Sequence, residues 1–135
     1  MNTKKFLKGA VSVSFFVIAF EWIFHGVIMK DSYAQTAYLW RPPEQMHSFL
    51  PFMTMGQILF SFVFTYIFIK GYEKKGIGEG VRYGLVMGIL FTGSMLVCYA
   101  VTPYPSQMVL SWIAATFVEL ILAGVILARI YQSKD

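Results

Sequence analysis

Four long apolar runs divide the chain, and short polar segments separate them. The runs cover about residues 6–29, 49–69, 81–101 and 107–130. A helix rises about 1.5 Å per residue, so about 20 apolar residues cross a bilayer core about 30 Å thick. The runs are continuous and lack the two-residue alternation of lipid-facing β-strands. The pattern therefore predicts an all-α polytopic membrane protein, a single domain over 1–135 that forms an antiparallel four-transmembrane-helix bundle.

The first run begins like a secretory signal, with Lys4, Lys5 and Lys8 ahead of an apolar stretch. No small-x-small cleavage pattern follows it, and the sequence continues as EWIFHG. The run is also longer than the apolar segment of a signal peptide. We therefore expect an uncleaved first span.

Composition favours a lipid-embedded chain. Of the 135 residues, 57% are hydrophobic and 13% are charged, whereas about 25% charged residues are usual in soluble domains. Cys98 is the single cysteine, which excludes an intrachain disulfide and a paired-cysteine metal motif.

Basic residues orient the predicted bundle. They gather at the N-terminus, between the second and third spans and at the C-terminus, as Lys4, Lys5, Lys8, Lys70, Lys74, Lys75, Arg82, Arg129 and Lys134. The other side carries Lys30 and Arg41. The positive-inside rule then predicts a bacterial-type inner membrane protein with both termini cytoplasmic. This topology accounts for the net charge of +4 without nucleic-acid binding. The expected partners are membrane lipids, and no nucleic acid is expected.

Aromatic residues are frequent near the external boundary. They are Trp22, Tyr33, Tyr38, Trp40, Tyr104 and Trp112. Such residues are typical of the belt that forms at the lipid headgroups.

Polar side chains inside the spans mark the faces that point away from lipid. Glu21 and His25 lie four residues apart on one face of the first helix. Gln57 and Ser61 share a face of the second, and Glu119 lies near the middle of the fourth. We expect these residues to line a polar pocket open to the external face. The two glutamates must be neutral, paired or hydrated there.

The third span carries Gly80, Gly84 and Gly88, one every four residues. Such rows let helix backbones approach closely. The row can pack within the bundle or against a second subunit. We favour packing within the bundle, because a four-helix unit needs a close seam.

A haem or metal site is one hypothesis for the polar residues. His25 and His47 are the two histidines, and both lie near the external side. Axial histidines can hold haem iron. No compact spacing such as HxxxH or ExxH occurs, so no cofactor is predicted and the His25–His47 site remains an alternative.

Transport is a second hypothesis. A glutamate in the first span, here Glu21, resembles the design of small multidrug exporters, in which one membrane carboxylate exchanges protons for cationic substrates. The resemblance implies that Glu21 carries the proton and that Trp22 is a stacking neighbour in the pocket. The other helix signatures of that family are absent and the external loop is larger. A proton-coupled small-molecule transporter is therefore an alternative.

The interpretation favoured by the sequence is a non-enzymatic accessory or structural subunit. No serine–histidine–acid set, acidic cluster or phosphate loop is present. Interhelical hydrogen bonds in membranes contribute about 0.6 kcal/mol each, so buried polar groups commonly specify a bundle. Its partners would be other membrane-protein subunits or a second copy of the chain.

Two segments carry a further resemblance. EWIFHGVIM closes the first span and GVRYGLVMGILF opens the third. Both resemble segments of small four-span bacterial membrane proteins to which no activity is assigned. The resemblance implies the same four-span topology and no particular chemistry.

Overall fold

The structure, a computed structural model, describes residues 2–132, and the regular elements within that range are all helical. Four helices are long: α1 (Thr3–Ile23), α3 (Pro43–Lys70), α4 (Ile77–Val101) and α5 (Ser106–Gln132). A π-helical turn, η1 (Phe24–Ile28), prolongs α1. All four long segments are long and apolar enough to cross a membrane. The prediction of an all-helical chain with four long apolar helices is confirmed.

The helices extend beyond the apolar runs that predicted them. The run expected to start at residue 49 belongs to a helix that begins at Pro43. A proline in the first turn lacks only an N–H group that the helix does not use, and its fixed φ suits the helix. The Pro42–Pro43 pair therefore starts α3. Similarly, α4 begins at Ile77 instead of residue 81. The apolar run missed this first turn because the turn contains Glu79 and two glycines.

Two short helices connect α1 and η1 to α3. They are α2 (Lys30–Gln35) and the 3-10 helix η2 (Ala37–Leu39). The Thr36 hydroxyl donates to the Ser32 carbonyl at 2.8 Å, and the Trp40 indole Nε1–H donates to the Thr36 hydroxyl at 2.9 Å. These bonds hold the connection as a compact structure at the end of α1.

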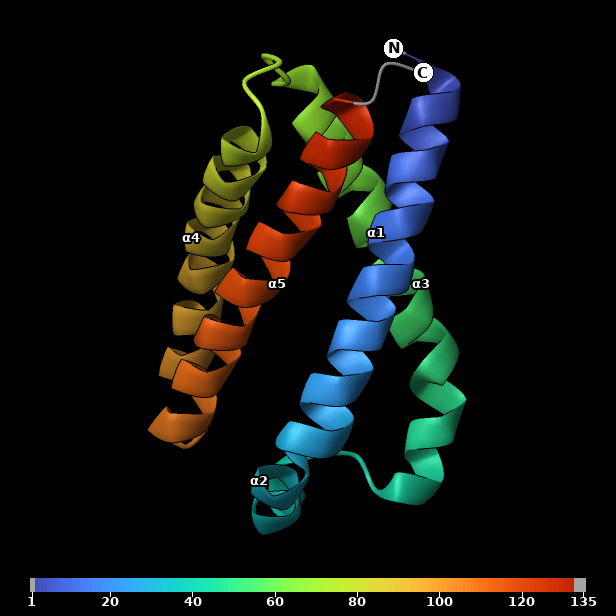
Figure 1. Cartoon of the computed structure of the whole chain (residues 1–135). Coiled ribbons are helices and arrows are strands. Elements are labelled where there is room, and N and C mark those ends of the chain that lie inside the picture. The colour runs from blue at the N-terminus through green and yellow to red at the C-terminus, as the bar shows by residue number, and fades with distance from the viewer. Residues whose placement is uncertain (1, 133–135) are drawn as a thin grey trace.

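The long helices pack in the order α4, α5, α1, α3 (Figure 1). Helices α4 and α5 lie side by side along their lengths, whereas α1 approaches α5 most closely near the start of the chain. A Cβ atom on Gly9 of α1 would lie 3.0 Å from Leu127 of α5 and 3.3 Å from Thr65 of α3. Three helices therefore meet at this point.

The core lies where the helices converge. Its buried residues come from all four helices: Val13, Val17, Phe64, Phe68, Met87, Leu120, Ala123, Leu127 and Ala128. The Tyr83 hydroxyl of α4 donates to the Phe64 carbonyl of α3 at 2.6 Å. This hydrogen bond joins α4 to α3, and the Tyr83 ring also packs on the Phe64 ring with centroids 4.6 Å apart.

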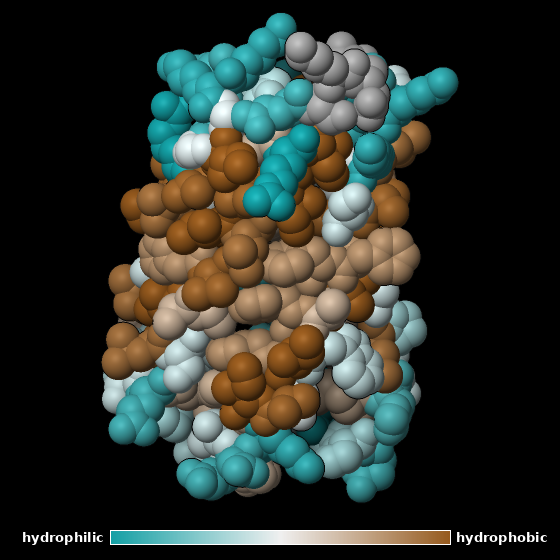
Figure 2. All heavy atoms as spheres, in the orientation of Figure 1, coloured by the Kyte–Doolittle hydropathy of each residue, from teal (hydrophilic) through white to brown (hydrophobic). Residues whose placement is uncertain are grey.

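The surface is apolar in the middle and polar at the two ends of the bundle (Figure 2). Large apolar side chains are exposed on every long helix, among them Phe15 at 73%, Leu59 at 65%, Ile89 at 66% and Leu110 at 65%. A water-soluble protein rarely exposes contiguous apolar surface of this extent. The pattern suits helices surrounded by lipid.

A close seam joins α4 to α5. A Cβ atom on Gly80 would lie 2.3 Å from the Gly124 carbonyl oxygen, and one on Gly84 would lie 2.4 Å from the Ile121 Cα. One on Gly88 would meet the Phe117 ring at 2.6 Å. The predicted glycine row therefore faces α5 within the chain, and only glycine allows this approach of the backbones.

We expect Gly84→Ala to push α4 and α5 apart and to lower the thermal unfolding temperature in detergent micelles. The matched control is Gly93→Ala in the same helix, where an added Cβ atom meets nothing within 4 Å. That change should be neutral or slightly stabilising, because alanine is favoured over glycine in a helix by about 1 kcal/mol. Equal melting temperatures for the two variants would contradict this account of the seam.

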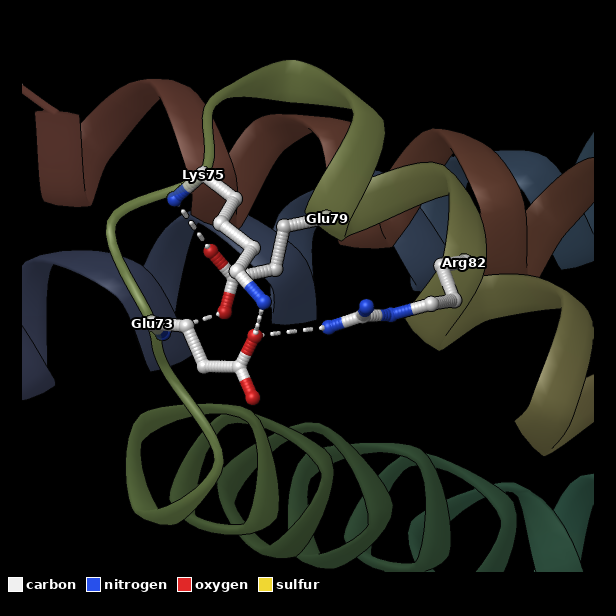
Figure 3. A network of polar contacts seen from close by, with 4 residues as sticks. All are labelled: Glu73, Lys75, Glu79 and Arg82. Atoms are coloured by element: carbon white, nitrogen blue, oxygen red, sulfur yellow. Dashed lines mark hydrogen bonds and ion pairs between the residues drawn. The ribbon is translucent and has the colours of Figure 1, made fainter.

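The loop between α3 and α4 is held by a buried carboxylate. Glu79 is 5% exposed, and its carboxylate accepts the backbone N–H of Glu73 at 2.6 Å and of Lys75 at 3.0 Å. Around it, the exposed Glu73 side chain pairs with Lys75 and, at 3.4 Å, with Arg82 (Figure 3). The hydrogen bonds and charges of Lys75 and Arg82 lower the pKa of Glu73. The loop therefore enters α4 in a fixed path.

Glu79→Ala should destabilise the fold by about 2 kcal/mol, because two backbone N–H groups lose a charged acceptor. Glu44→Ala is the control, since Glu44 lies in the first turn of α3 and is exposed. Both variants lose a dipole interaction of about 0.5 kcal/mol. Unfolding free energies in mixed micelles measure the difference, and equal values would show that the two amide bonds contribute nothing.

Candidate functional site

A chain of polar contacts runs through the end of the bundle opposite to the Glu79 loop. His25 Nε2 lies 3.2 Å from Glu21 Oε2, and His25 Nδ1 is hydrogen-bonded to the Tyr33 hydroxyl. The Trp112 indole Nε1–H donates to the same hydroxyl at 2.9 Å. The contacts therefore link α1, η1, α2 and α5 through three side-chain interactions.

Local helix geometry sets this arrangement. Glu21 and His25 are one turn apart, so their side chains share a face. The π-helical turn follows, in which the Met29 N–H donates to the Phe24 carbonyl at 2.9 Å. The chain then turns into α2, and the Tyr33 ring stacks on the His25 ring with centroids 5.8 Å apart and planes 15° from parallel. Single π turns are often found at functional sites.

Glu119 extends the polar chain into the interior. It is 7% exposed, and its carboxyl group lies close enough to that of Glu21 for the two groups to interact. Its Oε1 atom is buried, and no N–H or hydroxyl donor from residues 2–132 reaches it. The Glu21 and His25 side chains are 30% and 37% exposed. The site is therefore open at Glu21 and His25 and closed at Glu119.

An aromatic cluster covers the site at the end of the bundle. Trp40 packs edge-to-face on Tyr33 at 5.2 Å and stacks on Tyr104 at 5.8 Å, and Tyr104 packs edge-to-face on Trp112 at 5.0 Å. Below these rings, Phe24, Met29 and Met108 form a small buried core. Four of the aromatic residues assigned by the sequence to a headgroup belt thus contact one another and fix the position of Tyr33.

The surroundings keep the Tyr33 phenol protonated. Burial raises the pKa of Tyr33, the hydrogen bond from Trp112 lowers it, and the negative charge of Glu21 raises it further. The first and third effects outweigh the second. Tyr33 therefore has an O–H proton to donate.

The other residues predicted for the pocket make no polar contact with this group of side chains. Within residues 2–132, no hydrogen bond or ion pair joins Gln57 or Ser61 to the two glutamates or to His25. The Ser61 hydroxyl is instead buried and donates to the Gln57 carbonyl of its own helix at 2.7 Å. Trp22 is 68% exposed. The structure brings together Glu21, His25 and Glu119 from the predicted set.

The two histidines have different surroundings. Both ring nitrogens of His25 are engaged, one by Tyr33 and one by Glu21. His47 is exposed on α3 and lines a surface hollow with Leu50, Pro51 and Thr54. Among the described residues, no three His, Cys, Asp or Glu side chains gather where they could hold a metal ion.

Sequence reasoning missed the roles of Tyr33 and Trp112. Their hydroxyl and indole groups complete the polar chain from outside the first span. Tyr33 follows His25 by eight residues, but only the turn at η1 and α2 brings it back over the imidazole ring. The one available signal was that each is an aromatic residue with a polar atom, which must find a partner when buried.

Comparison with protein-family models, with curated proteins and with solved structures finds no match to this chain. Its function is therefore inferred from its own residues.

Proposed function

We propose that the chain is a single-domain, four-pass integral membrane protein of a bacterial-type inner membrane. The four apolar helices and the apolar middle of the surface support this. The bundle would be antiparallel, with both termini cytoplasmic, because the loop with Lys70, Lys74, Lys75 and Arg82 and both chain ends carry most of the basic residues. The Glu21–His25 site would then face the external side.

Within that topology, we propose proton-coupled transport of a small molecule through the Glu21–Glu119 carboxyl pair. The observation that carries the proposal is a buried Glu119 carboxyl, with an oxygen that no donor in the described part of the chain reaches, close to the partly exposed Glu21 carboxyl. Adjacent carboxyl groups cannot both be ionised at low cost, so such a pair holds one proton between them. A cation that binds Glu21 would replace that proton.

The surroundings of the pair support exchange. No lysine or arginine within residues 2–132 makes an ion pair with either glutamate, and the ion-pair partner of Glu21 is His25. A lysine or arginine would place a permanent positive charge beside the pair, and a histidine does not. This arrangement supports a site whose charge can change.

Purified protein in liposomes with an internal pH-sensitive dye tests this proposal, with ethidium as the probe cation. We expect ethidium to release about one proton per chain, and Glu21→Gln or Glu119→Gln to abolish the release. Glu44→Gln is the matched control, because Glu44 is exposed on α3 and should leave the release unchanged. Ethidium-independent proton release, or release that persists in both site variants, would refute the carboxyl pair as the exchange site.

The second candidate function is the accessory or structural subunit that the sequence favours. The observation that supports it is the exposed first half of α3, where Phe52 is 63%, Met53 is 51% and Met55 is 60% exposed. The buried residues of α3 begin only at Ser61. A hydrophobic helix of another membrane-protein subunit, or a second copy of the chain, would cover this half.

Extraction in mild detergent, followed by mass spectrometry of the intact complex, tests the accessory role. We expect a partner subunit to remain bound, and Met53→Lys to release it while the chain stays folded. The control is Val97→Lys on α4, since Val97 is also exposed, at 66%. A monomer from the native membrane at the lowest effective detergent concentration would count against this role.

A further inference from the structure

The hydrogen bonds around Tyr33 and His25 restrict where the protons of the site lie. An indole N–H can only donate, so the Tyr33 oxygen must accept the bond from Trp112. Tyr33 has one O–H, and the remaining partner of its oxygen is His25 Nδ1. Because the phenol keeps its proton and His25 Nδ1 is the remaining partner of its oxygen, we assign Tyr33 as the donor to His25 Nδ1. That nitrogen is then an acceptor and carries no proton of its own.

The acceptor role of Nδ1 determines where a neutral His25 ring carries its proton. A neutral imidazole with an unprotonated Nδ1 carries its hydrogen on Nε2. That atom lies 3.2 Å from Glu21 Oε2. His25 therefore donates to Glu21, and Glu21 has the donor that stabilises an ionised carboxylate.

Glu119, unlike Glu21, has a carboxyl oxygen with no donor nearby within residues 2–132. Its Oε1 atom meets no donor among the described residues, and an ionised buried oxygen without a donor is costly. A protonated Glu119 can instead donate its O–H to the Glu21 carboxylate, which accepts. Donors and acceptors are then matched through the chain from Trp112 to Glu21.

We propose that in the resting site Glu119 holds the proton of the carboxyl pair, Glu21 is ionised, and Tyr33 keeps His25 in the Nε2–H tautomer as the proton relay to the external end. This proton arrangement adds detail to the proposed transport function, and its role as a relay rests on that function. Tyr33 is a positioning residue, because it acts through His25.

The relay step conserves protons. A proton from the external side adds to Nδ1 and makes an imidazolium, which then transfers its Nε2 proton to the Glu21 carboxylate. The ring is left neutral with its hydrogen on Nδ1. The ring returns to the Nε2–H tautomer when Nδ1 releases its proton to water and Nε2 takes one up from water, since His25 is partly exposed. Tyr33 O–H favours this product, because only an unprotonated Nδ1 can accept its bond. The titratable groups that face His25 are Glu21 from α1 and Tyr33 from α2, with Glu119 of α5 behind Glu21.

Nitrogen NMR of protein labelled in its histidines tests the tautomer without any transported substrate. The chain has two histidines, so exposed His47 is an internal reference. We expect His25 to show a protonated Nε2 and an unprotonated Nδ1 at neutral pH. Tyr33→Phe should lower the ratio of Nε2–H to Nδ1–H by about tenfold, the factor for a lost bond of about 1.4 kcal/mol. A wild-type Nδ1–H tautomer or imidazolium would overturn the assignment.

Trp112→Phe serves as the matched variant, because it removes a donor to Tyr33 but leaves the Tyr33 O–H. The His25 tautomer should persist in it, and a loss equal to that in Tyr33→Phe would overturn the role of the Tyr33 proton. Both changes keep an aromatic ring, and unchanged thermal unfolding shows that each variant is folded.

Infrared spectroscopy locates the proton of the carboxyl pair. We expect one protonated-carboxyl band at neutral pH that disappears in Glu119→Gln and remains, shifted, in Glu21→Gln. The reverse pattern would overturn the assignment to Glu119. A correct tautomer and band in a protein that releases no proton to ethidium would reject transport and leave the charge assignment standing, so the two failures are distinguishable.

Discussion

The need to satisfy a buried carboxyl group is the constraint on which the interior depends. Glu119 lies among apolar helices with 7% of its surface exposed, where an unpaired charge would cost several kcal/mol. Its partner is Glu21, a carboxyl group on a different helix. Two acids can satisfy each other only if one keeps its proton, which ties the packing of α1 against α5 to the protonation of the site.

The two ends of the bundle hold their polar groups in different ways. At the Glu79 end, a carboxylate accepts two backbone N–H groups and is thereby held in place. At the other end, the partners of Glu21 are His25 and Glu119, which can themselves exchange protons. The aromatic rings around Tyr33 supply the rigidity there that backbone hydrogen bonds supply at the Glu79 end.

The sequence predicts the spans well because apolar length and helix rise determine them. Helical periodicity also places Glu21 beside His25 and aligns Gly80 with Gly84. Two features depend on information that periodicity lacks. The contact of Glu21 with Glu119 requires the rotation and axial offset of two helices far apart in sequence, and the position of Tyr33 requires the π turn. Gln57 and Ser61 share a helix face with each other, but that face does not determine which neighbour it meets.

The gradient of exposure through the site is the structural argument for the proposed proton exchange over a purely structural role. A polar group that only sets helix register works best when it is fully buried and fully bonded, as the Glu79 carboxylate nearly is. The other chain of contacts runs from partly exposed His25 and Glu21 to a buried Glu119 with an oxygen that no donor reaches. Such a site is exposed at one end and buried at the other. The proposed proton transfer would need only short movements between neighbouring side chains, whereas a role in helix packing alone would not require this order.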